Sequence, residues 1–447
     1  MALKITVIGT GYLGATHAAA MAELGFEVLG LDVVPEKIAM LQRGEVPMYE
    51  PGLEELLRKH VAGIEGSTGR LRFTMDWAEV AEFGDVHFMC TNTPQKHGEY
   101  ACDMSYVDRA FELLAPHLTR PALVVGKSTV PVGSADRLAA YLAAHAPAGA
   151  DAELAWNPEF LREGLAVEDT LQPDRIVVGV RSERAERLLR EVYAVPVGAG
   201  SPFVVTDFPT AELVKTAANS FLATKISFIN AMAEVCEAAD GDVVKLAEAI
   251  GHDERIGKKF LRAGIGFGGG CLPKDIRAFM ARAGELGADQ ALTFLREIDS
   301  INMRRRGQMV EMAREALGGG SFLGKRVAVL GAAFKPDSDD VRDSPALNVA
   351  GQIHLQGGQV TVYDPKGMDN ARRLFPTLGY ADTAVEAVRG ADVVLHLTEW
   401  REFRELDPAA LGEAVRARVV LDGRNALDPT LWRKAGWTFR AMGRPTA

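Results

Sequence analysis

The sequence is poor in cysteine, with only four in 447 residues. They form no Cys-x-x-Cys pair and no regularly spaced framework, so a disulfide-stabilised scaffold is not expected. A chain of this length buries ample core without covalent cross-links. We therefore expect a protein of a reducing compartment, the cytoplasm. The four residues are Cys90, Cys102, Cys236 and Cys271.

Long hydrophobic runs and an excess of basic residues are also missing. No stretch of 18 or more apolar residues occurs, and a strand-like run begins within four residues of the start, so neither a membrane span nor a signal peptide is expected. Lys and Arg total 50 against 60 Asp and Glu, for a net charge of −10, which argues against nucleic-acid binding. A small anionic ligand is not excluded, because it needs only a few local cations and backbone N–H groups. No group of His, Cys and Asp has metal-ligand spacing, so we predict no metal site.

The sequence does contain short apolar runs that end in glycine or polar residues and alternate with helical segments. This pattern predicts an α/β protein whose sheets are parallel and covered by helices on both faces. Hydrophobic residues make up 47% and charged residues 25% of the chain, as in ordinary globular proteins. The strands predicted are residues 4–9, 27–32, 85–91, 122–128, 176–180, 326–331, 359–364, 391–397 and 419–422.

Two changes in composition and hydrophobic spacing divide the chain into three parts. After Pro209 no proline occurs up to Ile250, and apolar residues fall near helical spacing, which predicts long helices. After a run of glycines at residues 318–320, glycine-terminated strands return. We therefore predict two Rossmann-like domains, residues 1–206 and 319–447, joined by a helical region over residues 207–318.

The run Gly9-Thr-Gly11-Tyr-Leu-Gly14 matches the pattern GxGxxG between a strand and a helix. Asp32 ends the next predicted strand, 18 residues after Gly14. Glycines let the backbone approach a pyrophosphate at a helix N-terminus. The carboxylate of Asp32 accepts hydrogen bonds from a ribose 2′-OH but repels a 2′-phosphate, so the pattern predicts NAD rather than NADP.

Polar residues also follow two other predicted strands. Thr91 and Thr93 follow one of them, and Ser128 and Thr129 follow the next. Ligands bind at the carboxyl edge of open α/β sheets, but Ser, Thr and Asn also favour plain turns. Either reading fits these residues taken alone.

The run Gly266-Phe-Gly-Gly-Gly-Cys271-Leu-Pro-Lys274-Asp275 is the most informative in the chain. Pro273 suits the first turn of a helix, so Cys271 is expected at a helix N-terminus near Lys274, and both features lower the pKa of a thiol. A thiolate there is a candidate nucleophile toward a carbonyl. Asp275 falls on the same helical face, where it can hold a water or a cation.

Two further pairs share a spacing of four residues. Glu159 and Glu163 are expected on one face of a short helix that begins at Asn157 and a proline. Lys215 and Asn219 are expected on one face of the long helix, where they can hold a developing oxyanion or position a water. Each pair can also be explained without a function, as polar residues on a helix face that is exposed to solvent.

Taken together, these runs resemble the nucleotide-sugar 6-dehydrogenases of the UDP-glucose and GDP-mannose dehydrogenase family. The resemblance covers essentially the whole chain. It implies an N-terminal NAD domain, a C-terminal sugar-nucleotide domain and a helical region that forms a homodimer. The motifs, in the family's order, are GTGYLG, YEPGLEELL, KSTVPVG, NPEFLREG, AELVKTAANSFLATKISFIN, GFGGGCLPKD, FKPDSDDVRDSP and DGRN.

The resemblance implies oxidation of a primary C6 alcohol to a carboxylate with two NAD and one water, and UDP-glucose as the substrate. By motif, Cys271 corresponds to the nucleophile that forms a thiohemiacetal and then a thioester. Lys215 and Asn219 correspond to groups that stabilise the C6 oxygen, and Asp275 and Thr129 to groups that hold the hydrolytic water. Glu159 corresponds to the proposed general base.

The resemblance also implies two sets of binding residues. Arg255 matches an arginine that reaches the partner subunit's nucleotide, and Lys335 and Arg424 match cations near the diphosphate. The residues expected to bind NAD are Gly9, Gly11, Tyr12, Leu13, Gly14, Asp32, Lys37, Thr91, Thr93, Thr129, Glu163, Lys274 and Lys335. The residues expected to bind the nucleotide sugar are Glu159, Phe160, Leu161, Arg162, Glu163, Lys215, Asn219, Arg255, Phe267, Gly268, Phe334, Lys335 and Arg424.

Several alternatives stay open. A GDP-mannose 6-dehydrogenase can carry the same cysteine run, whereas the N-acetyl-sugar branch usually has a histidine before the cysteine. A one-step hydroxy-acid dehydrogenase leaves Cys271 without a role, and the intact candidate residues argue against a non-catalytic sensor. Gly270 departs from the serine common at that position. His97 and Cys102 lie in a segment without a family match and are expected to be loop residues.

Overall fold

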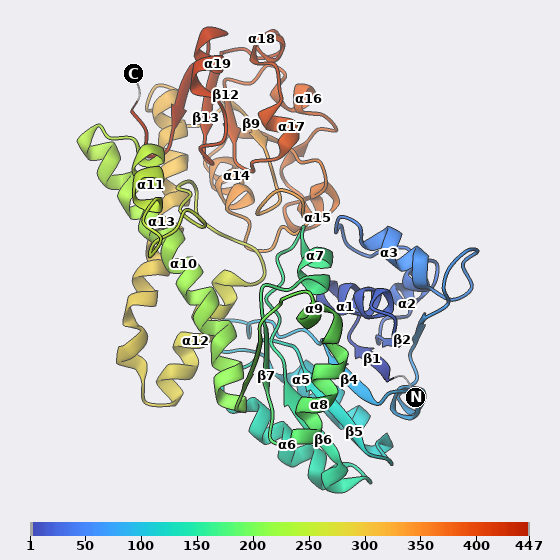
Figure 1. The fold of residues 1–447 in the computed structure, drawn as a ribbon. Coiled ribbons are helices and arrows are strands. Elements are labelled where there is room, and N and C mark those ends of the chain that lie inside the picture. The colour runs from blue at the N-terminus through green and yellow to red at the C-terminus, as the bar shows by residue number, and fades with distance from the viewer. Residues whose placement is uncertain (1–2, 446–447) are drawn as a thin grey trace. The chain divides into compact units, whose positions relative to one another are not determined.

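A computed structural model describes residues 3–445. The chain forms two compact units. The first contains the chain up to Ala218 together with Arg277–Leu286, and the second contains Asn219–Ile276 and the chain from Gly287 onward. Each unit is built around its own sheet (Figure 1). This confirms the predicted α/β class with two Rossmann-like sheets.

The sheet of the first unit has eight strands in the order β3-β2-β1-β4-β5-β6-β7-β8. All neighbours pair in parallel except β6 and β7, which meet through one antiparallel pair, Trp156 and Gly179. The order reverses between β1 and β4, where ligands bind in open α/β sheets. The strands are β1 (Lys4–Ile8), β2 (Glu27–Leu31), β3 (Leu71–Thr74), β4 (Val86–Met89), β5 (Ala122–Gly126), β6 (Ala152–Trp156), β7 (Ile176–Gly179) and β8 (Phe203–Thr206).

The strands near the centre of this sheet are buried on both faces, because separate apolar layers cover the two sides. One layer joins α1, α3 and α8 to Val7 and Phe88, and the other joins α4, α5 and α6 to Ile8 and Met89. Alternate side chains along a strand therefore enter different cores. The helices are α1 (Tyr12–Glu23), α2 (Pro35–Gln42), α3 (Leu53–His60), α4 (Trp77–Phe83), α5 (Ser105–Leu114), α6 (Ser134–His145), α7 (Ala166–Leu171), α8 (Glu183–Val192) and α9 (Ala194–Gly198).

The predicted helical region forms four helices, which are α10 (Phe208–Ala239), α11 (Val243–Gly251), α12 (Leu272–Glu285) and α13 (Thr293–Ala316). The 32 residues of α10 contain only one proline, at the second position, where a missing N–H costs no helical hydrogen bond. The Asp242 carboxylate accepts from two backbone N–H groups and so begins α11.

The sheet of the second unit has six parallel strands in the order β11-β10-β9-β12-β13-β14. Its order is therefore that of the first six strands of the other sheet. The strands are β9 (Arg326–Leu330), β10 (Gln359–Tyr363), β11 (Gly379–Tyr380), β12 (Val393–His396), β13 (Val419–Asp422) and β14 (Thr438–Ala441). The helices are α14 (Pro345–Leu355), α15 (Met368–Leu374), α16 (Ala384–Val388), α17 (Arg401–Arg404), α18 (Pro408–Leu411) and α19 (Pro429–Lys434).

The sequence analysis missed five strands, β3, β6, β8, β11 and β14. Strand β8 lies at a sheet edge with partly exposed side chains, and β11 has only two residues. Strands β6 and β14 are interrupted by Glu153 and Arg440 and so lack a continuous apolar run, whereas the apolar residues of β8 were overlooked.

Candidate active site

In the first unit, the glycine run forms a tight turn between β1 and α1. Gly9 has φ +89° and donates its N–H to the Leu31 carbonyl oxygen at 2.8 Å. A Cβ on Gly14 would lie 1.8 Å from the Gly9 carbonyl oxygen, so no larger residue fits. A Cβ on Gly11 would meet only the Asn92 side chain, at 3.8 Å. Gly11 therefore leaves space at the N-terminus of α1, as a pyrophosphate requires, and Leu13 packs against the apolar core.

Asp32 follows β2 and is buried. One oxygen of its carboxylate accepts from the Thr10 backbone N–H at 2.9 Å and from Lys37 Nζ at 2.8 Å. Val33 and Val34 beside it are exposed. The segment thus places a carboxylate at the end of the strand, and Lys37, the cation that contacts it, is paired with that same carboxylate.

Thr91, Thr93 and Thr129 lie after β4 and β5, as predicted. Thr93 is buried, and Thr91 and Thr129 are partly exposed. The Thr91 hydroxyl oxygen is buried without a hydrogen-bond partner in the described chain. An orphaned hydroxyl at the carboxyl edge of the sheet, next to the glycine turn, fits a bound dinucleotide.

The predicted short helix at Glu159 and Glu163 is wrong. Residues 157–165 form a loop, and the next helix, α7, begins at Ala166. Side chains satisfy the backbone donors here, because Glu159 accepts from Leu161 N at 2.6 Å and Asp169 accepts from Arg162 N at 2.8 Å. Those N–H groups are therefore unavailable to a helix.

Glu159 and Lys215, predicted separately, form an ion pair of 3.0 Å within the first unit. The Lys215 side chain is only 6% exposed. The Phe160 ring lies 5.8 Å from Lys215 Nζ and 3.8 Å from the Arg175 guanidinium. A carboxylate and an ammonium this close can share the task of taking a proton from an alcohol and holding its oxygen.

Tyr12 and Arg162 are engaged with acidic groups of their own unit. The Tyr12 hydroxyl donates to the buried Glu50 carboxylate, and burial raises the pKa of Tyr12. Arg162 pairs with Asp169 through two nitrogens. Glu50, which sequence reasoning missed, also accepts from Gly164 N and Ala166 N at 2.7 Å each and so holds the turn that carries Glu163.

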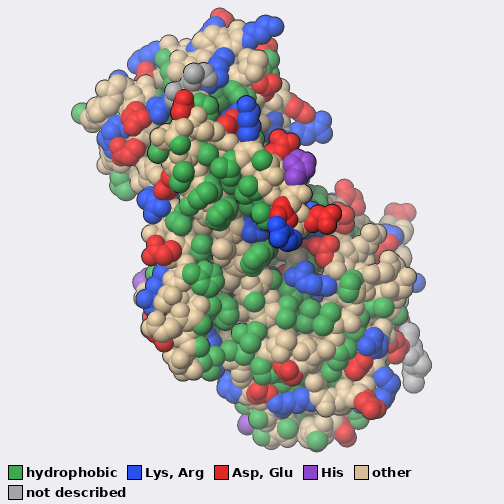
Figure 2. All heavy atoms as spheres, turned by 60° about the vertical axis from the view of Figure 1, so that its left-hand side comes forward, with side chains coloured by type: hydrophobic (Ala, Val, Ile, Leu, Met, Phe, Trp, Pro, Cys, Tyr) green, Lys and Arg blue, Asp and Glu red, His purple; other side chains and the backbone are tan. Residues whose placement is uncertain are grey.

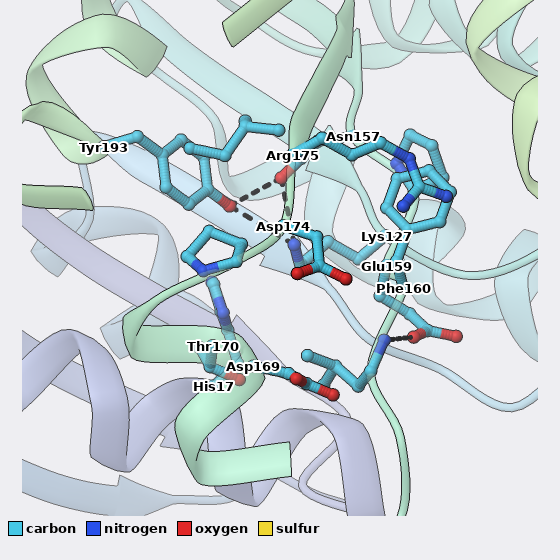
Figure 3. Close-up of a pocket in the computed structure, with 14 residues that line it drawn as sticks. His17, Lys127, Asn157, Glu159, Phe160, Asp169, Thr170, Asp174, Arg175 and Tyr193 are labelled. Atoms are coloured by element: carbon cyan, nitrogen blue, oxygen red, sulfur yellow. Dashed lines mark hydrogen bonds between the residues drawn. The ribbon is translucent and has the colours of Figure 1, made fainter. Parts of the chain in front are cut away.

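Sequence reasoning also missed Lys127, which precedes Ser128 and Thr129. Its amine donates to Asn157 Oδ1 at 2.9 Å and contacts the Tyr193 hydroxyl at 3.2 Å (Figure 3). Burial lowers the pKa of Lys127 to about 8. The available signal was a lysine at the end of a wholly apolar strand, a position where a charged side chain is seldom found unless it is paired.

In the second unit, Cys271 directly precedes α12 and is exposed. Its carbonyl oxygen accepts the first helical hydrogen bond, from Asp275 N at 2.9 Å. Asp275 is 1% exposed, and its two oxygens contact Asn219 Nδ2 and Lys274 Nζ at 2.6 Å each. The thiol thus lies where the helix dipole favours a thiolate, one turn before a buried carboxylate and amide.

The glycines before Cys271 are packed against their own unit. A Cβ on Gly268 would lie 2.3 Å from the Asp343 carbonyl oxygen, one on Gly269 2.9 Å from the Phe334 ring, and one on Gly270 2.3 Å from the Arg342 guanidinium carbon. The Arg342 guanidinium is the end of a flexible, exposed side chain and can move aside for a larger residue at position 270.

Phe267, Phe334 and Arg424 belong to the same packed region. Phe267 is buried. Arg424 donates to the carbonyl oxygens of Leu397, Gly266 and Phe334, at 2.8, 2.8 and 3.1 Å. Burial lowers the pKa of Arg424. The guanidinium thus ties the loop of Cys271 to the loop of Phe334 and Lys335.

The remaining predicted residues lie outside these two groups. Arg255 is 89% exposed on the segment after α11 and pairs with Asp253. His97 lies in a loop, and Cys102 is buried. Within residues 3–445, no three His, Cys, Asp or Glu side chains are arranged to hold a metal ion. In the same residues, no helix combines the length and apolarity needed to cross a membrane.

Comparison with known proteins agrees with this geometry. Three domains of the UDP-glucose/GDP-mannose dehydrogenase family match the chain, namely the NAD binding domain at residues 3–196, the central domain at 209–304 and the UDP binding domain at 328–429. The UDP-glucose 6-dehydrogenase of Rhizobium meliloti is 41% identical over 99% of this chain and 100% of its own. YwqF of Bacillus subtilis, another UDP-glucose 6-dehydrogenase, is 38% identical over 99% and 98%.

A solved structure shows the same fold. The UDP-glucose dehydrogenase of Pyrobaculum islandicum superposes with a TM-score of 0.90 at 36% identity, over 99% of this chain and 98% of that one. The chain therefore belongs to the UDP-glucose/GDP-mannose dehydrogenase family.

Proposed function

We propose that this protein oxidises the C6 alcohol of UDP-glucose to the carboxylate of UDP-glucuronate, using two NAD and one water. The substrate assignment is supported by the match to a UDP binding domain and by relatives of full length that act on UDP-glucose. The observation that carries the chemistry is the exposed Cys271 just before α12, one helical turn ahead of the buried Asp275.

In this proposal the first unit prepares the alcohol. Glu159 takes the hydroxyl proton, and the Lys215 ammonium, 3.0 Å from Glu159, stabilises the oxygen as its charge grows. NAD, when bound at Gly9–Gly14 and Asp32, accepts a hydride in each oxidation. Thr91, Thr93 and Glu163 complete its site.

The second unit supplies the nucleophile. The Cys271 thiolate adds to the aldehyde to give a thiohemiacetal, whose oxidation gives a thioester. Asp275 holds the water that hydrolyses the thioester, a role that the family resemblance also gives to Thr129 of the first unit, and Asn219 stabilises the oxyanion. Lys335 and Arg424 hold the nucleotide diphosphate, and Phe267 and Phe334 line its site.

We further propose that the protein is a cytoplasmic homodimer whose shared surface is residues 207–260. Phe221, Phe228 and Val235 recur every seven residues on α10 and are exposed. Figure 2 shows hydrophobic side chains gathered on the face that carries the helical region. Arg255 would then reach the partner's nucleotide. Domain boundaries at residues 206 and 318 belong to the same proposal.

An assay of NADH formation across UDP-glucose, GDP-mannose, dTDP-glucose and UDP-N-acetylmannosamine tests the function. We expect kcat/KM for UDP-glucose to exceed that for each other sugar nucleotide by at least tenfold, with UDP-glucuronate identified by mass spectrometry. A preference for GDP-mannose would support the alternative family activity. If no substrate gives NADH, the proposed dehydrogenase activity is refuted.

A further inference from the structure

A cavity of about 50 Å³ lies behind the loop of Glu159, within the first unit. Lys127, Asn157 and Glu159 line it, and so do His17 of α1 and Tyr193, which follows α8 (Figure 3). Asp174, which is exposed, also lines it. The cavity thus extends from the buried interior beside the catalytic loop toward the surface.

The cavity wall carries hydrogen-bonding groups that the described protein does not satisfy. His17 is fully buried, and neither of its ring nitrogens has a partner in the described chain. Buried polar groups are nearly always paired with protein or water. A water needs only about 10–15 Å³ of such space together with polar partners. The volume and the orphaned imidazole together indicate that the cavity is hydrated.

Lys127 is fixed at the centre of this wall. Its amine and the Tyr193 hydroxyl both contact Asn157 Oδ1, at 2.9 and 2.5 Å, while Asn157 Nδ2 donates to the Val177 carbonyl oxygen at 2.8 Å. Asn157 is therefore held from three elements. It begins the loop that places Glu159 opposite Lys215.

The charges around Lys127 come from several elements. Burial opposes the charged ammonium and lowers the pKa of Lys127 to about 8, while the Glu159 carboxylate favours the charge. Burial holds the pKa of His17 well below its usual value and raises that of Cys90 to about 12. Burial raises the pKa of Tyr193 as well. Of these four groups, Lys127 is the one whose pKa lies closest to neutral pH.

The reaction itself produces protons. Oxidation of a primary alcohol with one water and two NAD⁺ gives a carboxylate, two NADH and three protons. The hydrides leave with the cofactor, so the protons must pass from the catalytic base to solvent. Glu159 receives the first of them in the proposed mechanism, and Glu159 is also among the residues that line the cavity.

We propose that this cavity is a hydrated proton exit, in which Lys127 receives protons from Glu159 through water and releases them toward the surface near Asp174. This inference rests on the proposed function. In each cycle the Lys127 ammonium first gives a proton to cavity water, and the amine that results takes the next proton from the Glu159 carboxyl through water. The carboxylate of Glu159 is thereby restored for the next oxidation.

The experiment compares wild type with Lys127→Met and Lys127→Arg in dilute buffer, at saturating UDP-glucose and NAD. Arginine keeps a cation beside Asn157 but does not release its proton, because its pKa exceeds 12. We expect kcat to fall about tenfold or more in both variants. Added imidazole should restore it, because a small buffer can carry the proton instead. KM should change little, and Lys59→Met, at an exposed lysine, serves as the control.

Two results would overturn the proposal. One is wild-type kcat in dilute buffer for either variant. The other is a loss of kcat that imidazole does not restore in a variant with wild-type melting temperature, which would make Lys127 an anchor for Asn157 only. If Lys127→Met fails to fold, the kcat of Lys127→Arg and its response to imidazole decide whether the proposal holds. A wild-type protein that forms no NADH from UDP-glucose would refute the function instead.

Discussion

The two sheets have the same strand order over six strands, but the loops after their first strands differ. After β1, Gly9 turns the chain directly into α1, whose third residue, Gly14, packs on the Gly9 carbonyl oxygen. After β9, Gly331 begins a loop over residues 331–344, and α14 begins only at Pro345. The first loop presents a helix N-terminus for a pyrophosphate. The second loop has no such tight turn into a helix and carries two cationic residues, Lys335 and Arg342.

The acidic residue after the second strand differs in the same way. Asp32 lies beside the exposed Val33 and Val34. Asp364, its counterpart after β10, accepts from Ala332 N and Ala333 N and from the buried Trp400 indole at 2.9 Å. Asp32 also accepts from a backbone N–H of its loop, at Thr10, but only Asp364 is covered by a buried tryptophan. One architecture has been adapted to two ligands through its first loop, and this assigns NAD to the first unit.

The largest effect is expected from Cys271→Ser in the second unit. Serine has similar size but is hardly ionised near neutral pH, so the covalent steps should fail while the first hydride transfer survives in part. We expect steady-state kcat to fall by several powers of ten, about 4 kcal/mol or more of barrier. Steady turnover to free uronate by this variant would contradict the covalent mechanism. The mass of the enzyme after mixing shows whether a stable ester accumulates.

Two glycines of the first loop should respond differently to alanine. In Gly14→Ala the new Cβ meets the Gly9 carbonyl oxygen at 1.8 Å, so we expect a loss of stability of ~1–3 kcal/mol together with weak NAD binding. In Gly11→Ala the nearest atom is 3.8 Å away. Its melting temperature should stay at the wild-type value while KM for NAD rises about tenfold. An unchanged KM for NAD in Gly11→Ala would contradict the proposal that the pyrophosphate of NAD binds at this turn.

Cofactor choice tests the role of Asp32. We expect kcat/KM for NAD to exceed that for NADP by about tenfold or more, because the carboxylate repels a 2′-phosphate and Lys37 is already paired with it. Initial rates with each cofactor measure this ratio, and Asp32→Asn should lower the ratio of kcat/KM for NAD to kcat/KM for NADP. Equal rates for the wild-type enzyme would sink this assignment.

The last prediction concerns how the free energy of unfolding depends on pH. Folded protein releases the Lys127 proton near pH 8, whereas an unfolded chain keeps it up to about 10.5. Between these values the unfolded state binds more protons, so stability of the wild type should rise with pH relative to Lys127→Met, by up to about 1.4 kcal/mol per pH unit. Denaturant unfolding of both proteins from pH 7.5 to 10 measures the difference. Parallel curves would mean that the amine titrates normally.

Local patterns in the sequence were enough to predict the glycine turn, Asp32 and the position of Cys271 before a helix. Each depends on residues close together in the chain, whose spacing determines the geometry. The Lys127–Tyr193–Asn157 cluster could not be predicted, because its members lie up to 66 residues apart and meet only in the folded unit. The loop at Glu159 was misread because Asp169 supplies an acceptor that helix-start rules do not consider.

The central claim is that one enzyme carries the alcohol through two oxidations, and the ratio of NADH formed to UDP-glucose consumed tests it most directly. We predict two NADH for each UDP-glucuronate, with one carboxylate oxygen taken from labelled water through hydrolysis of the Cys271 thioester. One NADH for each sugar nucleotide, with an aldehyde released and no label incorporated, would contradict the account.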